Sequence, residues 1–172
     1  MKKIGLIAIT LLLILTGCGS KTNVMSSYKD FNVKNNHFES KKYSELVDDM
    51  INKVPGIYYV GFADCPWCRD LVPVFEEVLA ENDMKAMYLD VYDPQFTNNE
   101  ALKEKYLEFI KTFDAGIAND GKSPFTFVIY EDGTIKGHTG TAPNHNAKEV
   151  EMTEQEVEYL KVRLNGLLEG LK

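Results

Sequence analysis

Two cysteines that lie two residues apart are the residues of this chain best suited to chemistry. They form the motif Cys65-Pro66-Trp67-Cys68, while the third cysteine, Cys18, stands far from them near the start of the chain. A thiolate can attack a disulfide and a neighbouring thiol can then resolve the mixed disulfide, so the spacing suits thiol–disulfide exchange. An apolar run precedes the motif and an amphipathic stretch follows it. This strand-then-helix context favours a redox motif over a chance pattern.

The two cysteines are expected to have different roles. A helix that begins at the motif places Cys65 at its start, where unpaired backbone N–H groups and the helix dipole favour an anion. Cys65 is therefore the expected nucleophile, with a pKa below the usual ~8.5, and Cys68, one turn further on, is the expected buried resolving thiol. The positive charge of Arg69 favours the thiolate, whereas the carboxylates of Asp64 and Asp70 oppose it.

The two residues between the cysteines fit the same interpretation. Pro66 suits the first helical position because proline has no N–H group to leave unpaired there. Trp67 is expected at the surface beside the cysteines, where it would offer an apolar contact to a partner chain. The alternative is that Trp67 is a packed core aromatic.

Two other functions for the cysteine pair remain open. A purely structural disulfide would close a very short loop and would therefore constrain the unfolded chain little. A structural zinc site needs two further ligands. The three histidines, His37, His138 and His145, show no paired spacing, and His145 is expected in a solvated loop. A copper or zinc site built from both thiolates and one histidine is the remaining metal alternative.

The N-terminus has the pattern of an export signal. Lys2 and Lys3 precede an apolar run over residues 4–15, and Leu15-Thr16-Gly17-Cys18 resembles a bacterial lipobox. The apolar run has about a dozen residues, whereas a membrane-spanning helix needs roughly 20. We therefore predict that residues 1–17 are a lipoprotein signal peptide and that Cys18 becomes the lipidated N-terminus, with a plain membrane anchor as the alternative.

Charge and compartment restrict the partners further. Removal of the two lysines at positions 2 and 3 would change the net charge from −7 to −9. Such an acidic chain is unsuited to binding nucleic acid, so membrane attachment would come from acyl chains. Outside the cytoplasmic membrane no glutathione pool keeps a cysteine pair reduced. Residues 18–36 lack apolar periodicity and are predicted to be a flexible tether, and residues 37–172 a single domain.

The periodicity of apolar residues predicts alternating helices and strands in this domain. A helix after the cysteines should be kinked at Pro73, and Glu131-Asp132-Gly133 should be the turn of a hairpin. Thr153 opens a capping box for the last helix. The other predicted elements are helices over 42–53 and 99–113, strands over 37–39, 57–62, 86–92, 125–130 and 134–138, and a loop over 115–122. This order indicates an α/β fold with a mixed central sheet flanked by helices on both faces.

From about Phe38 to Lys172 the chain resembles the thioredoxin fold. The residues that carry the resemblance are the strand leading into the cysteine motif, Arg69, Pro73, Ser123-Pro124 before a strand, Gly133 and Gly140. The resemblance implies that Pro124 follows a cis bond and faces the cysteines. It also implies that the backbone of Ser123 pairs with a substrate strand and that its hydroxyl lies near the sulfurs.

The chain also departs from the thioredoxins. Tyr59 stands where they carry a buried carboxylate that accepts a proton from the second cysteine, and the stretch over 93–123 is longer. The Pro-Trp dipeptide replaces their Gly-Pro, and a proline at its first position occurs in glutaredoxin-like and periplasmic oxidase-like relatives. In size and layout the chain is similar to small secreted or lipid-anchored members from Gram-positive bacteria, including bacteriocin accessory proteins.

Taken together, these patterns predict a monomeric, lipid-anchored thiol–disulfide oxidoreductase on the extracytoplasmic face of the bacterial membrane. Its substrates would be cysteine pairs of exported proteins or peptides, and the Cys65–Cys68 disulfide would be its only redox group, without metal or other cofactor. The direction of electron flow stays open, and a reductase would also need an electron-transfer partner in the membrane. A non-catalytic accessory lipoprotein, related to bacteriocins or transport, is the alternative.

Overall fold

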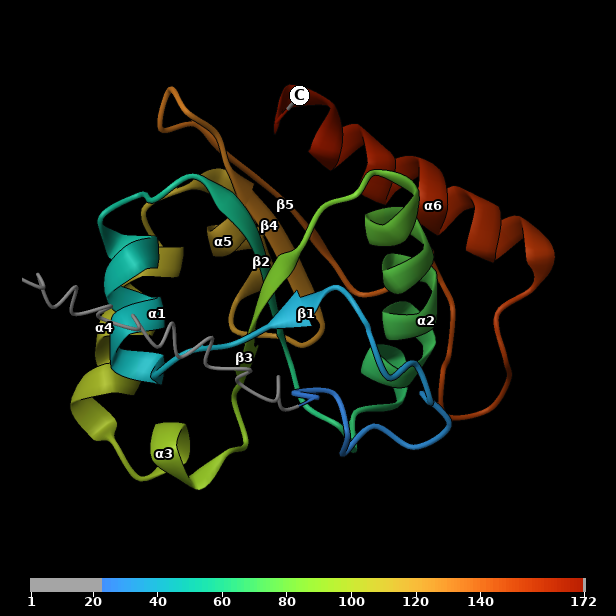
Figure 1. Ribbon diagram of the computed structural model, residues 1–172, viewed down its shortest axis with the longest axis horizontal. Coiled ribbons are helices and arrows are strands. Elements are labelled where there is room, and N and C mark those ends of the chain that lie inside the picture. The colour runs from blue at the N-terminus through green and yellow to red at the C-terminus, as the bar shows by residue number, and fades with distance from the viewer. Residues whose placement is uncertain (1–22, 172) are drawn as a thin grey trace, which may run out of the picture.

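The computed structural model of this protein describes residues 23–171 and contains a five-stranded sheet with the order β1-β3-β2-β4-β5 (Figure 1). β1, β3 and β2 are parallel, β4 is antiparallel to β2, and β5 is antiparallel to β4. The strands are β1 (Phe38–Glu39), β2 (Gly56–Gly61), β3 (Ala86–Asp90), β4 (Phe125–Ile129) and β5 (Ile135–Thr139). The helices are α1 (Tyr43–Ile51), α2 (Pro66–Glu81), α3 (Pro94–Thr97), α4 (Glu100–Ile110), α5 (Asp114–Asn119) and α6 (Glu154–Leu168), followed by a 3-10 turn, η1 (Glu169–Leu171).

Helices cover both faces of the sheet. α2 and α6 lie on one face and α1 and α4 on the other, as Figure 1 shows. The central strand β2 is buried from Ile57 to Gly61, as expected for a strand covered on both sides. Its side chains alternate, so Tyr59 belongs to the core under α2 and α6 and Tyr58 to the core under α1 and α4. β2 therefore joins both cores and leads directly into the cysteine motif.

The predicted fold class is confirmed. The sheet is mixed, its helices lie on both faces, and its strand order with an antiparallel β4–β5 hairpin is that of the thioredoxin fold. The predicted hairpin turn lies between β4 and β5, and Thr153 and Glu156 form the predicted capping box of α6. α2 contains Pro73, as the pattern predicted.

The prediction of a flexible tether is wrong for residues 23–36. Met25, Tyr28 and Phe31 are buried in the core under α2 and α6, so the folded unit begins before residue 37. These three apolar side chains, spaced three residues apart among polar neighbours, are too few to show helical or strand periodicity. Together they nevertheless pack one side of the segment against the core. The predicted signal peptide and Cys18 lie outside the described residues.

The predicted loop over 115–122 is also wrong, because α5 occupies residues 114–119. A Cβ at Gly116 would lie 1.9 Å from the carbonyl oxygen of Ile110, so this close approach to the end of α4 requires glycine. The sequence pattern also missed α3, whose N-cap is the side chain of Asp93. Both helices are too short to show apolar periodicity. None of the helices within residues 23–171 is long and apolar enough to cross a membrane.

Candidate active site

The cysteine motif forms the junction between β2 and α2. Cys65 is the N-cap of α2, with Pro66 in the first turn, and its Sγ accepts a hydrogen bond from the backbone N–H of Cys68 at 3.3 Å. Cys68 is fully buried, whereas Cys65 keeps 4% of its surface exposed. Both cysteines are free thiols. The helix start thus points backbone donors at Cys65, as a nucleophilic sulfur requires.

The surroundings of the two thiols shift their pKa values in opposite directions. The pKa of Cys65 is lowered to about 7, first by a hydrogen bond from the Cys68 side chain, then by the N–H groups of Cys68 and Trp67 and by the charge of Arg69, against the opposing effect of burial. Burial raises the pKa of Cys68 far above its usual range, and the neighbouring Cys65 adds to that rise. Two thiols whose pKa values are driven apart are suited to separate roles in one reaction.

The loop before β4 brings a third part of the chain to the cysteines. The Ser123–Pro124 peptide bond is cis, as the resemblance implied. The carbonyl oxygen of Ser123 accepts a hydrogen bond from the Cys65 thiol at 3.6 Å, although the two residues are far apart in sequence. Pro124 is buried, and its carbonyl accepts from the N–H of Gly140 at 2.9 Å, which ties this loop to the end of β5.

Trp67 is held by the loop between β5 and α6. It is half-buried, its Nε1 donates to the carbonyl of His145 at 3.2 Å, and Lys148 lies over its ring at 5.7 Å from the centroid. The side chain of His145 is buried between two carboxylates, with Asp70 Oδ2 at 2.7 Å from Nε2 and Glu156 Oε1 at 3.8 Å from Nδ1. Trp67 therefore lies partly at the surface but is anchored to a neighbouring loop.

This arrangement corrects the expectation that His145 is a solvated loop residue. The error has a physical cause: the partner Asp70 is 75 residues away on α2, so no local pattern marks the pair. The same contact gives the Asp70 carboxylate a hydrogen-bond partner in His145. The other flanking carboxylate, Asp64, is exposed to solvent.

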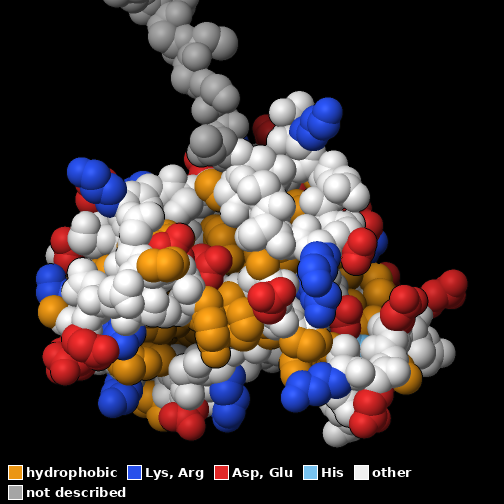
Figure 2. Space-filling view, turned by 90° about the horizontal axis from the view of Figure 1, so that it is seen from below, with side chains coloured by type: hydrophobic (Ala, Val, Ile, Leu, Met, Phe, Trp, Pro, Cys, Tyr) orange, Lys and Arg blue, Asp and Glu red, His pale blue; other side chains and the backbone are white. Residues whose placement is uncertain are grey.

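Apolar side chains surround the motif at this end of the molecule. Seen from the end of the sheet where α2 begins, orange side chains gather near the middle of the face with charged ones around them (Figure 2). Phe62, just before the cysteines, stacks on Tyr92, with ring centroids 4.0 Å apart, and Tyr92 is 67% exposed. Together with the half-buried Trp67, this pair offers an apolar surface beside Cys65.

Each histidine side chain contacts a group other than the cysteines. His37 Nδ1 lies 2.8 Å from the carboxylate of Glu76, and His138 Nε2 lies 2.9 Å from the carbonyl of Thr141. Within residues 23–171 no three side chains of His, Cys, Asp or Glu are grouped to hold a metal ion. The arrangement therefore offers no third ligand for the metal alternative within this part of the chain.

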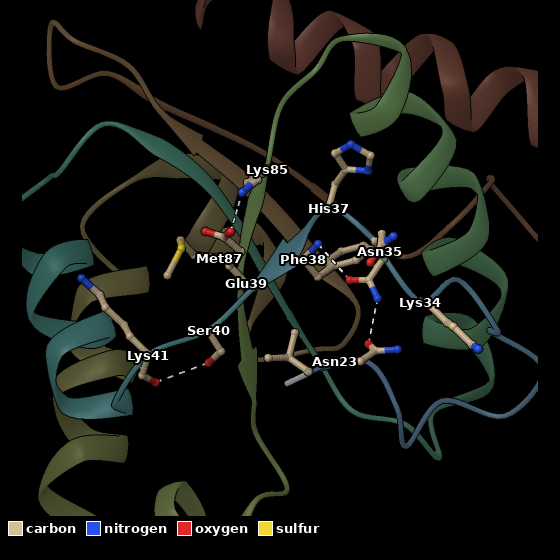
Figure 3. Close-up of a pocket in the computed structure, with 12 residues that line it drawn as sticks. Asn23, Lys34, Asn35, His37, Phe38, Glu39, Ser40, Lys41, Lys85 and Met87 are labelled. Carbon is tan, nitrogen blue, oxygen red and sulfur yellow. Dashed lines mark hydrogen bonds and ion pairs between the residues drawn. The ribbon is translucent and has the colours of Figure 1, made fainter. Parts of the chain in front are cut away.

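A pocket lies at the edge of the sheet, beside β1 (Figure 3). It has a volume of about 700 Å³, and polar side chains such as Asn36, Glu39 and Lys85 line it. Lys85 and Glu39 form an ion pair at 2.5 Å across it. Neither cysteine nor Ser123 contributes to its lining, so it is separate from the redox motif.

Comparison with known proteins shows a likeness to a solved structure. No family model matches the chain. Among solved structures, thioredoxin O2 from Arabidopsis thaliana in the oxidized state is similar, with a TM-score of 0.46 and 18% sequence identity over 79% of this chain and 95% of that one. The fold assignment rests on the strand order described above. The chain has a thioredoxin-like fold with a Cys-x-x-Cys pair at the start of α2, opposite a cis-proline.

Proposed function

We propose that this protein is a thiol–disulfide oxidoreductase in which Cys65 and Cys68 form the redox pair. One observation carries the proposal: Cys65 is the N-cap of α2 with a pKa lowered to about 7, while burial raises the pKa of Cys68 beside it. A thiol with a pKa near ambient pH is the best attacking group in thiol–disulfide exchange. A buried disulfide would need no such difference between its two sulfurs.

The geometry supports a two-step exchange. In the reductive direction, the Cys65 thiolate attacks a substrate disulfide, a Cys65–substrate bond forms, and one substrate sulfur leaves as a thiolate. Cys68 then loses its proton and attacks the Cys65 sulfur, which releases the second substrate thiolate and leaves the Cys65–Cys68 disulfide. In the oxidative direction the same steps run in reverse, and Cys68 is then the leaving thiolate. No cofactor beyond the cysteine pair takes part in this scheme.

The residues around Cys65, among them Ser123, Pro124 and Trp67, offer contacts to a substrate. The carbonyl of Ser123 lies against Cys65, and an extended substrate segment beside it could pair with this backbone. Trp67 and the Phe62–Tyr92 pair provide apolar contacts next to the reacting sulfur. Arg69 adds positive charge that favours the thiolate. The substrates that fit are cysteine pairs in unfolded or extended polypeptides.

The proposed location rests on the sequence. The basic start, the apolar run over residues 4–15 and the lipobox-like stretch ending at Cys18 support a lipid anchor outside the cytoplasmic membrane. The substrates there would be exported proteins or peptides, the protein would act as a monomer, and a membrane partner would supply electrons if the direction is reductive. A Cys18→Ser variant tests the anchor: the protein should then stay unprocessed or leave the membrane fraction. Unchanged acylation would rule this anchor out.

Activity in both directions tests the function. The wild-type protein should reduce insulin disulfides in the presence of a dithiol, or oxidise a reduced peptide after it has itself been oxidised. Cys65→Ser should abolish both activities, since it removes the attacking sulfur. Cys68→Ser should also stop turnover but should accumulate a mixed disulfide at Cys65 that non-reducing mass spectrometry detects. Equal activity of the wild type and a variant that carries both Cys65→Ser and Cys68→Ser would refute the proposal.

A further inference from the structure

A pair of buried tyrosine hydroxyls lies behind the resolving cysteine. Tyr59 on β2 is fully buried in the same core as Cys68, and Tyr28 from the N-terminal segment is 4% exposed. Their hydroxyl oxygens are 3.0 Å apart. In Figure 1 the blue N-terminal segment, to which Tyr28 belongs, runs beside the first turns of α2.

Gly61 shows how closely Tyr59 approaches the sulfur. A Cβ at position 61 would lie 2.5 Å from the hydroxyl oxygen of Tyr59 and 3.0 Å from Cys68 Sγ. The hydroxyl and the sulfur therefore both border the space that Gly61 leaves open, and a larger residue would crowd them there. The two residues also stand in the right chemical relation: a hydrogen bond from Tyr59 lowers the pKa of the Cys68 thiol, against the larger effect of burial, which raises it.

Each phenol has a single hydroxyl proton, and this determines which hydroxyl donates in each hydrogen bond. Burial raises the pKa of both phenols well above the usual range, so each keeps its single proton and can donate one hydrogen bond. When Tyr59 donates to Cys68, it has no proton left for its neighbour, and the Tyr28–Tyr59 bond must then run from Tyr28 to Tyr59. Each donor in such a chain polarises the next, which strengthens the bond to the sulfur.

We propose that Tyr59 is a catalytic residue that donates a hydrogen bond to the Cys68 thiolate, and that Tyr28 is a positioning residue that orients the Tyr59 hydroxyl. The inference rests on the redox function proposed above. A phenol that keeps its proton cannot act as the base that a carboxylate would be. Instead, it stabilises the charge on a sulfur that burial otherwise destabilises.

The same contact serves both directions of exchange. When a substrate thiolate attacks Cys65 of the disulfide, the Cys65–Cys68 bond breaks and its electron pair goes to Cys68, which leaves as the thiolate facing Tyr59. When Cys68 resolves a mixed disulfide, its proton passes to the buffer and the thiolate so formed attacks the Cys65 sulfur. The electron pair of the broken bond then leaves with the substrate sulfur. In each case Tyr59 acts on Cys68 and not on Cys65.

A two-phase reaction with dithiobis-nitrobenzoate, an aryl disulfide that releases a coloured thiolate, tests the proposal. The reduced protein should release one equivalent when Cys65 attacks and a second when Cys68 resolves the mixed disulfide. Tyr59→Phe should leave the first phase unchanged and slow the second roughly 10- to 100-fold, because a hydrogen bond to a charged group is lost. Tyr28→Phe should slow the second phase only a few-fold, because Tyr59 keeps its own proton.

Tyr58→Phe is the matched control. Tyr58 is the neighbouring residue on β2, is 2% exposed, belongs to the core on the opposite face of the sheet, and donates to the carbonyl of Val54. The substitution removes a phenol hydrogen bond without touching the cysteines, so both phases should keep their wild-type rates. Fluorescence of Trp67 verifies that each variant is folded, and Tyr28→Phe decides the question if Tyr59→Phe does not fold.

The outcomes separate this inference from the proposed function. If the wild type shows two phases and Tyr59→Phe leaves the rate of the second phase unchanged, the role of the tyrosines is overturned and the redox pair remains. If Tyr59→Phe does not fold, an unchanged second phase in Tyr28→Phe has the same meaning. If Tyr59→Phe slows both phases equally, or if Tyr58→Phe also slows the second phase, the role of Tyr59 is structural. Release of only one equivalent by the wild type would refute the redox pair itself and the tyrosine role with it.

Discussion

The fold gives two identical side chains, those of Cys65 and Cys68, very different surroundings. Cys65 caps α2 and meets hydrogen-bond donors, whereas Cys68, one turn later, meets the core. The sequence was sufficient to predict this contrast, because a helix start after a buried strand is a local pattern. It was insufficient to predict Tyr28 or His145, since their partners Tyr59 and Asp70 are 31 and 75 residues away.

The lowered pKa of Cys65 predicts a pH profile. Alkylation of Cys65 by iodoacetamide should be half-maximal near pH 7 and should fall about tenfold per pH unit below it, because the thiol that forms there is unreactive. Cys68→Ala removes the largest cause of the shift and should move the midpoint up towards ~8.5. Quantitative peptide mass spectrometry measures the rate at this residue alone. A wild-type midpoint near ~8.5 would contradict the electrostatic argument.

At the scale of the elements, the junction of β2 and α2 depends on close packing. Gly61→Ala should lower the free energy of unfolding by about 1–3 kcal/mol, because its Cβ would overlap the hydroxyl of Tyr59 and crowd Cys68. Gly166→Ala is the control, since nothing lies within 4 Å of its Cβ and it sits in the interior of α6. That change should stabilise the protein by roughly 0.5–1 kcal/mol. Urea unfolding measures both, and equal effects would show that the crowding at Gly61 is unimportant.

The loop before α6 should be held to α2 by His145. His145→Ala leaves the partly buried carboxylate of Asp70 without its partner and should cost about 1–3 kcal/mol of stability. The chain has one tryptophan, so the emission of Trp67, whose Nε1 donates to the backbone of this loop, should shift to longer wavelength as the loop loosens. Lys148→Ala removes only the exposed cation over the ring and should change stability by no more than about 1 kcal/mol. An unshifted spectrum in His145→Ala would contradict this role.

At the scale of the whole molecule, local patterns predicted the sheet and its main helices, and they failed where the chain has no regular structure. Residues 23–36 resemble a linker in composition, yet three of their side chains complete the core under α2 and α6. α3 and α5 were missed because helices of four and six residues are too short to show periodicity. α3 packs against α4, whereas α5 packs against β5 and α4, and no local pattern encodes these contacts.

The packing of the N-terminal segment leads to a stability prediction. Met25 is fully buried, so Met25→Ala should lower the free energy of unfolding by about 2–5 kcal/mol. Ser27→Ala, at an exposed position in the same segment, should change it by less than about 0.5 kcal/mol. Thermal unfolding of both variants gives the comparison. If Met25→Ala were as stable as Ser27→Ala, the segment would behave as the flexible tether that its composition suggests.

The most direct test of the central claim is a redox titration of the protein in graded dithiol buffers, with the cysteine state read by alkylation and mass spectrometry. The account predicts one two-electron transition, with a tenfold change in the reduced-to-oxidised ratio for each ~30 mV, that disappears in both Cys65→Ser and Cys68→Ser. The midpoint would also show whether the pair favours oxidation or reduction of its substrates. Cysteines that stay reduced in oxidising buffer, or a transition that survives either substitution, would contradict the account.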